Sequence, residues 1–439
     1  MHRHQHNRKK FSGFTLLELL IVIGLIAALM TMSVVVMSGF LTTAEVEATS
    51  ATIQKTFRLL EQRIDAFDRA FKGSRKQGAI SATKGLLLDP NQDGDYSDAI
   101  FGVSHEAIEI LAKKAMFRFE FPQRFAERIV GTGDSDSNGN LDGDNNANGM
   151  PDVLEFAIAA PTAKQQLITE GNPTPTQAEI DARVLSNWAN HNPVTESAEL
   201  LYFTLVYSTS YGSAAVDSDR FTNREVADTD NDGLPEFIDA WGQPLRYYRW
   251  PTRLVDTDPP VPFQPILNDP NDLTDVVVPV DTDGNGTVDV TVGQRKIDAL
   301  ERNLAAILLK GLPPAPTVLP NGVLPRDLLL TDPDDPVGIL YFELERLNGL
   351  NGMPLFRNEF NETKYHTPDT FHAPLIVSLG KDGKLGLYEP NDTANLGNLA
   401  RYNDDLNGNG TIGEAEDFEL MLEEVADNIT NRNKRAGGK

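Results

Sequence analysis

One continuous apolar stretch near the N-terminus constrains the fold of this chain more than any other feature. Residues 14–40 contain no Lys, Arg, Asp or His, and a single carboxylate, Glu18, interrupts them. A helix rises about 1.5 Å per residue, so the stretch is long enough to cross a bilayer core of about 30 Å. We therefore predict a transmembrane helix over residues 14–40.

The residues before this stretch predict its orientation. Basic side chains precede it at Arg3, Arg8, Lys9 and Lys10. The bias of basic residues toward the cytoplasm places the leader inside and the rest of the chain outside. A secretory signal peptide has a shorter apolar core and a cleavage site after it, whereas the small pair Ser12-Gly13 comes before. We expect a single-pass inner-membrane protein with its C-terminal bulk in the periplasm, or displayed on a cell-surface filament.

The carboxylate of Glu18 is a functional candidate because a charge in the bilayer costs several kcal/mol unless it is paired. If the chain is cut after Gly13, the new amino group of Phe14 lies one helical turn from Glu18, and the same amine on a neighbouring subunit is a second partner. The sequence GFTLLELL with its basic leader resembles the signal of type IV prepilins and type II secretion pseudopilins. The resemblance implies cleavage after Gly13 by a prepilin peptidase, N-methylation of Phe14, and a role for Glu18 in filament register. A simple membrane anchor is the alternative.

The apolar spacing after residue 40 predicts that the helix continues. Apolar residues recur at steps of four and three at Ile53, Phe57, Leu60, Ile64, Phe67 and Phe71. This spacing predicts an amphipathic stem helix over 41–72 that packs against a globular head and ends at Gly73 and the KGSRKQG segment. Helical spacing also occurs in 104–115, 177–190 and 196–208.

The expected organisation has five parts: a leader at 1–13, the transmembrane helix at 14–40, the stem at 41–72, an inserted head region at 73–235, and a C-terminal sheet region at 236–439. The expected fold class is α+β and pilin-like, with the long N-terminal helix packed on a C-terminal antiparallel sheet. The insertions are expected to be mostly helices and loops.

The composition of the chain favours divalent cations as ligands. The net charge is −25 and there is no cysteine. Such an acidic chain disfavours nucleic acid and anionic lipid as partners, and no disulfide can stabilise the exported part. Concentrated carboxylates instead point to structural divalent cations, and we expect Ca²⁺.

Three acidic loops match the spacing of calcium loops, which take oxygens from positions 1, 3, 5, 9 and 12 and place Gly at position 6. The candidate ligands are Asp144, Asn146, Asn148, Asp152 and Glu155 in the first loop; Asp228, Asp230, Asp232, Glu236 and Asp239 in the second; and Asp405, Asn407, Asn409 and Glu416 in the third. Three further segments, 89–98, 134–144 and 281–290, match only in part. A solvated Asp-Gly turn is the alternative for any single loop.

Two later segments carry a second resemblance. D-x-W-G-x-P at 239–244 and SLGKDG at 378–383 resemble the C-terminal signature of the major, G-type pseudopilin of type II secretion systems. The resemblance implies structural roles for Trp241, Gly242 and Pro244 in a sheet that packs on the stem. It also implies a calcium-loop residue at Asp382.

These patterns favour a structural role over an enzymatic one. The leading hypothesis is a pilin-like subunit that assembles with other pseudopilin subunits on an inner-membrane assembly platform and aids protein export. The alternative is a calcium-dependent adhesin or binding module on a pilin-type stem. An enzyme is disfavoured because no nucleophile or phosphate-loop motif occurs, and the spacing of His366 and His372 does not match a zinc motif.

Overall fold

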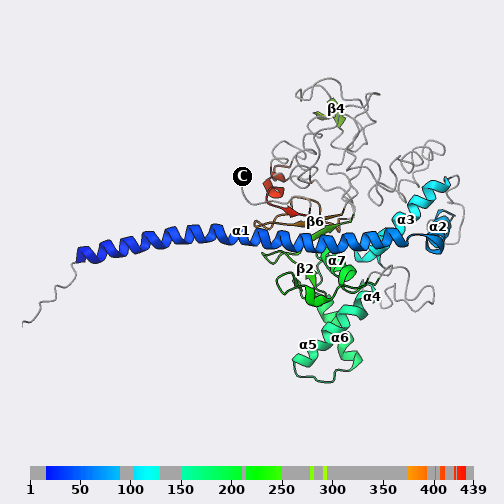
Figure 1. Ribbon diagram of the computed structural model, residues 1–439, viewed down its shortest axis with the longest axis horizontal. Helices are drawn as coiled ribbons and strands as arrows, with labels where there is room; N and C mark the ends of the chain where they lie inside the picture. Colours follow the sequence, from blue (N-terminus) through cyan, green and yellow to red (C-terminus); the bar gives the residue numbers. More distant parts are fainter. Residues whose placement is uncertain are drawn as a thin grey trace, which may run out of the picture.

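The computed structural model describes residues 16–88, 103–128, 150–209, 214–249, 277–280, 290–293, 374–392, 401, 406–410, 420–421 and 423–431. A long helix, α1 (Leu16–Ala70), dominates the molecule. Its N-terminal part projects as a rod beyond the head, and its C-terminal part runs through the head with elements on both sides (Figure 1). The stem and the apolar segment are therefore one continuous helix.

The projecting part of α1 and its embedded part differ in exposure. Leu16, Leu19 and Leu20 are exposed, and so are most apolar side chains described up to Phe40. From residue 53 onward, the side chains of Ile53, Phe57, Leu60, Phe67 and Phe71 are buried in the main core of the head. The predicted apolar stripe is thus the surface on which the head packs. Within the part of the chain that the structure describes, no helix is found that is long and apolar enough to cross a membrane.

The head contains mostly short helices. In order they are α2 (Gly73–Leu88), α3 (His105–Glu120), the 3₁₀ turn η1 (Phe125–Glu127), α4 (Asp152–Leu154), the π-helical turn η2 (Glu155–Ala159), α5 (Ala160–Thr169), α6 (Gln177–Trp188), α7 (Glu196–Val206) and the 3₁₀ turn η4 (Ser218–Arg220). The helices expected in 104–115, 177–190 and 196–208 correspond to α3, α6 and α7. The stem helix ends at Ala70, close to the expected end at Gly73, and after a short break the KGSRKQG segment begins a new helix, α2.

The strands within the described residues form three small antiparallel sheets. β1 (Val226–Ala227) pairs with β2 (Glu236–Phe237), and β4 (Val277–Val280) pairs with β5 (Val290–Gly293). The third sheet has the order β3-β6-β7, with β3 at Arg246–Tyr248, β6 at Leu375–Ser378 and β7 at Ile429–Thr430. β6 and β7 contact α1. The mixed α+β class, with an N-terminal helix and small antiparallel sheets, is confirmed.

Among the described residues of the head, two large apolar cores stand beside a small cluster at Ala107 and Leu111. The main core joins the stem to α3, α7 and the β3-β6-β7 sheet through side chains that include Phe117, Leu201, Tyr247, Ile376 and Ile429. A second core joins α4, α5 and α6 to the other face of α7 and to Leu234. Every residue of α7 after Glu196 is buried, and side chains of this helix belong to both cores.

Candidate metal centre

The loop between β1 and β2, residues 228–235, is curled by its own carboxylates. The side chain of Asp228 accepts a hydrogen bond from the backbone N–H of Gly233 (3.1 Å). Asp230 accepts from the N–H of Asp232 (3.2 Å), and Asp232 accepts from the N–H of Leu234 (2.7 Å). Each alternate acid therefore bonds the backbone two to five residues ahead, which turns the acidic side chains toward one centre.

Two residues of this loop adopt left-handed backbone conformations. Asn231 has φ 64° and Gly233 has φ 95°. Asn and Gly tolerate this region best, which explains these residue types at these positions. A Cβ on Gly233 would also lie 3.2 Å from the Nδ2 atom of Asn187 on α6. The sequence Asp-Asn-Asp-Gly thus permits a turn that also packs closely on a helix.

The connection between α6 and α7 holds the loop in place. The backbone N–H of Asn192 donates to Asp230 (2.9 Å), and the hydroxyl of Thr195 donates to the same carboxylate oxygen (3.2 Å). The ring atom Nδ1 of His191 lies 2.7 Å from Oδ2 of Asp232. The loop is therefore fixed against the residues that lead into α7.

Four side chains from these elements could hold a metal ion. One ligand atom from each of His191, Glu199, Asp230 and Asp232 lies within 4.8 Å of all the others. Glu199 comes from the first turns of α7 and is only 1% exposed. The site therefore combines the predicted loop with a carboxylate from a helix that precedes it in the chain.

Several carboxylate oxygens in this region are buried without a hydrogen-bond partner. They are both oxygens of Glu199, Oδ1 of Asp228 and Oε2 of Glu236. The second oxygen of Glu236 accepts from the backbone N–H of Thr229 (2.7 Å), which holds this side chain beside the loop. Buried oxygens that no donor satisfies are costly, and a cation would satisfy them.

The electrostatics of the carboxylates match this geometry. Burial, and then the charge of Asp232, raise the pKa of Glu199 well above its ordinary value. Burial and neighbouring acids raise the pKa of Asp228 to about 6 and that of Glu236 to about 8. The pKa of Asp232 is also raised, mainly by burial. Like charges that are buried together favour either protonation or a bound cation.

His191 is the positive group that faces these acids. Burial alone would lower its pKa, but the carboxylate of Asp232, 2.7 Å away, and that of Glu196, 3.6 Å away, raise it to about 9. Its ring stacks on Trp188 (centroids 4.0 Å apart) and on Phe125 (5.2 Å). His191 carries one positive charge, and the acids of the loop and of α7 that surround it outnumber it.

Asp239, predicted as the twelfth-position ligand of this loop, has different partners. Its Oδ1 atom accepts from the backbone N–H groups of Trp241 and Gln243 (both 2.9 Å), and its Oδ2 atom accepts from the hydroxyl of Ser378 (2.7 Å). Asp239 is 1% exposed. Both of its oxygens are thus occupied within the turn that follows β2.

The turn after Asp239 contains the predicted structural residues. The indole N–H of Trp241 donates to Glu45 on α1 (2.9 Å), and the ring packs against the main core. Gly242 has φ 82°, which favours glycine, and Pro244 forms an isolated bridge with Ile238. This turn therefore contacts the stem helix directly.

The other predicted ligands are only partly within the described residues. Asp152 and Glu155 are buried at the start of α4 and η2. Asn407 accepts from the N–H of Asn409 (2.9 Å), and the exposed Asp382 accepts from Lys384 (2.9 Å). The predicted positions outside the described residues are Gly13, Phe14, Asp144, Asn146, Asn148, Asp405 and Glu416; Glu18 lies on α1, two residues after its start.

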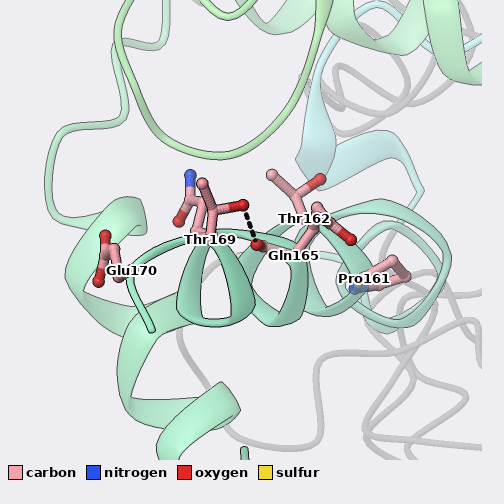
Figure 2. A pocket seen from close by; sticks show the side chains of 6 residues that line it. Pro161, Thr162, Gln165, Thr169 and Glu170 are labelled. Carbon is pink, nitrogen blue, oxygen red and sulfur yellow. Dashed lines mark hydrogen bonds between the residues drawn. The ribbon is translucent and has the colours of Figure 1, made fainter. Parts of the chain in front are cut away.

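A surface hollow on α5 is lined by none of the residues of the acidic cluster. It has a volume of about 530 Å³, and its lining includes Pro161, Thr162, Gln165 and Thr169. Figure 2 shows these side chains along one helix, with the hydroxyl of Thr169 donating to the carbonyl of Gln165 (2.8 Å). The one carboxylate there, Glu170, is paired with Arg183. The hollow therefore lacks the converging donors of a metal centre.

Sequence reasoning missed Glu199 and His191 as members of the site. Glu199 lies in the apolar run AELLYFTLV, and a lone acid in an apolar run is the same signal that drew attention to Glu18. His191 lies in an ordinary polar connection, and no sequence signal marks it. Neither residue falls on the spacing of a calcium loop.

Comparison with known proteins defines the class of the N-terminal segment. Residues 8–34 match the family model described as the prokaryotic N-terminal methylation motif. This motif implies a type IV pilin-like protein that is processed by prepilin peptidase. Pilin-like proteins are generally non-enzymatic structural subunits. No curated protein and no solved structure matches the chain.

Proposed function

We propose that this chain is a structural subunit of a type II secretion pseudopilus or a related type IV pilus-like filament. The observation that carries the proposal is the continuity of the methylation motif with α1, which runs without a break from the exposed apolar part into the core of the head. A subunit of this form is anchored by its apolar part until it is extracted into a filament. Its head then lies on the outside.

The assembly step follows from the chemistry of the motif. Cleavage after Gly13 creates the amino group of Phe14, and Glu18 lies one helical turn further on. In an apolar bundle, an unpaired charge is costly, so the carboxylate of one subunit pairs with the amine of its neighbour. This pairing sets the register between stems, and growth of the filament at the assembly platform aids protein export.

The head in this proposal is stabilised by calcium at the loop of residues 228–236. Calcium prefers six to eight oxygen ligands, and this loop supplies alternate carboxylates on a tight curve. The chain has no cysteine, so a cation is the available cross-link for an exported head. The loops at 144–155 and 405–416 and the turn at Asp382 are further candidate calcium sites.

A calcium-dependent adhesin on a pilin-type stem is the second candidate. It shares the N-terminal motif and the acidic loops, and it differs in what the head contacts. The large inserted head favours this alternative, because it is bulky for a densely repeated subunit. Deletion of the gene distinguishes the two: a loss of secreted protein supports the export role, and a loss of surface adhesion without a secretion defect supports the adhesin.

The experiment that tests the proposal is co-expression with the cognate prepilin peptidase. Mass spectrometry is expected to show loss of residues 1–13 and one methyl group on Phe14. Cross-linking is then expected to detect ladders of the processed chain in the membrane fraction. An unprocessed chain, or a processed chain that stays monomeric while export continues, would contradict the proposal.

A further inference from the structure

The acid predicted to close the loop that begins at Asp228 already has other hydrogen-bond partners. In calcium loops of this spacing, the acid at position 12 binds the ion through both oxygens. Here that position is Asp239, whose oxygens accept hydrogen bonds from Trp241, Gln243 and Ser378. A complete oxygen shell around the loop therefore needs another carboxylate.

The side chain of Glu199 meets this need. It is 1% exposed, neither of its oxygens has a hydrogen-bond partner, and one oxygen lies within 4.8 Å of ligand atoms of both Asp230 and Asp232. Calcium–oxygen distances are about 2.3–2.6 Å, so ligands on opposite sides of one ion are separated by about 5 Å. The spacing of the carboxylates is that of ligands around a single cation.

We propose that Glu199 of α7 supplies the closing carboxylate of a calcium site whose other ligands come from the loop of residues 228–236. This inference rests on the proposed calcium site in the head and extends it to a second element of the fold. Asp228 and Glu236 each have one further buried oxygen without a hydrogen-bond partner in the same loop. His191 keeps its ring N–H on Asp232 and acts as a positioning residue, since calcium prefers oxygen to nitrogen.

Calcium in this arrangement joins two parts of the chain that the sequence separates. Asp228 and its neighbours follow β1, whereas Glu199 lies on the helix shared by both apolar cores. Without the ion, the same carboxylates repel one another inside the protein. The ion therefore converts a destabilising cluster into a cross-link between the β1-β2 hairpin and α7.

The test uses the full chain in detergent micelles and two readouts. The first is luminescence of Tb³⁺, a calcium substitute, excited through Trp188, whose ring stacks on His191 beside the site. This signal reports the local site rather than the other acidic loops, and the variant Trp188→Phe confirms its origin by losing it. The second readout is the shift in the thermal unfolding midpoint, Tm, when Ca²⁺ is added after chelation.

The decisive variant is Glu199→Gln, which keeps the shape of the side chain and removes its charge. It is expected to weaken Tb³⁺ binding and its displacement by Ca²⁺ at least tenfold and to reduce the Ca²⁺-induced Tm shift. The Tm of the cation-free protein is expected to stay equal or rise, because a buried unpaired charge is gone. Glu170→Gln, on the surface of α5, is the silent control.

Other outcomes overturn the inference. If Glu199→Gln binds Tb³⁺ within twofold of the wild type, or lowers Tm equally with and without Ca²⁺, Glu199 has only a packing role. If Asp239→Asn weakens binding more than Glu199→Gln does, the loop closes on its own acid. If the wild type shows no response to either ion, the calcium site of the head fails with the inference, whereas processing and export, measured separately, still stand.

Discussion

The carboxylate of Asp239 accepts a hydrogen bond of 2.7 Å from the hydroxyl of Ser378, 139 residues further along the chain. Asp239 begins the Trp-Gly-Gln-Pro turn and Ser378 ends β6, so the bond joins the two segments that carry the pseudopilin-like signature. Ser378 also accepts from the backbone N–H of Gly380 (3.1 Å). One buried acid therefore fixes the turn on the stem to the end of the central strand of the sheet.

Replacing Ser378 by Ala is expected to destabilise the head by about 1–3 kcal/mol, because the buried Asp239 loses a hydrogen bond and no water can replace it. Urea unfolding of the full chain in detergent measures the loss. Ser218→Ala, at an exposed position, is the control and is expected to change stability little. Equal stability of the two variants would contradict the role given to this bond.

The buried pair of Glu127 and Arg249 predicts a pH dependence. Arg249 donates to both oxygens of Glu127 (2.6 and 3.0 Å), and Arg118 donates as well (3.1 Å). Burial alone would raise the pKa of Glu127, but these arginines lower it from 4.5 to about 2. A lowered folded-state pKa stabilises the fold above pH 4.5, and that contribution disappears as the pH falls toward about 2.

The expected cost of Glu127→Gln at pH 7 is about 3–5 kcal/mol, since it leaves the buried Arg249 without its partner. The difference between this variant and the wild type is expected to shrink between about pH 5 and pH 2. Urea unfolding at pH 7, 5 and 3 measures this trend. Glu109→Gln, which breaks a more exposed pair with Lys76, is the control; a difference for Glu127→Gln that is constant with pH would refute the assignment.

Removal of calcium is expected to lower the Tm of the wild-type head. A ligand at 100 times its dissociation constant stabilises a fold by about 2.7 kcal/mol, so the shift should follow the logarithm of the calcium concentration. Calorimetry with chelator and then with added Ca²⁺ measures it. Magnesium at the same concentration is expected to give a smaller shift, because it demands stricter octahedral geometry and gives up its water reluctantly.

Replacing Glu18 by Ala is expected to abolish filament formation and export while leaving cleavage after Gly13 intact, because the variant removes the acid that pairs with the neighbouring amine. Membrane cross-linking and the level of secreted protein measure these effects. Glu47→Ala, at an exposed position on the same helix, is the matched control. Normal export in the Glu18 variant would remove the basis for the proposed register.

Local patterns in the sequence predicted the parts of the fold that depend on local spacing. The stripe that contains Ile53, Leu60 and Phe67 identified the packing face of the stem because helical periodicity alone determines it. The alternate acids of the loop after β1 were predicted as ligands from the spacing of a calcium loop, which is also a local pattern. Spacing could not reveal the partners of Asp239, since its hydrogen bond to Ser378 depends on how distant segments meet.

Glu199 shows that sequence spacing also fails to reveal a member of the candidate metal site that comes from a distant segment. A spacing rule searches one loop at a time, whereas this acid reaches the loop from a helix that begins before β1. Its position in the apolar run AELLYFTLV was the available signal, since an acid is seldom buried without a partner. A search for lone acids in apolar runs therefore complements a search for loop motifs.

Helix α7 has a second attachment at its other end, where the guanidinium of Arg63 on the stem donates to the carbonyl of Leu205 (3.1 Å). The acidic cluster lies near the first turns of α7, and the stem is hydrogen-bonded to its last turn. A pull along the stem is therefore expected to reach the β1-β2 hairpin through α7. We expect the mechanical stiffness of the contact between α7 and the β1-β2 hairpin to depend on whether protons or a cation neutralise the acidic cluster there.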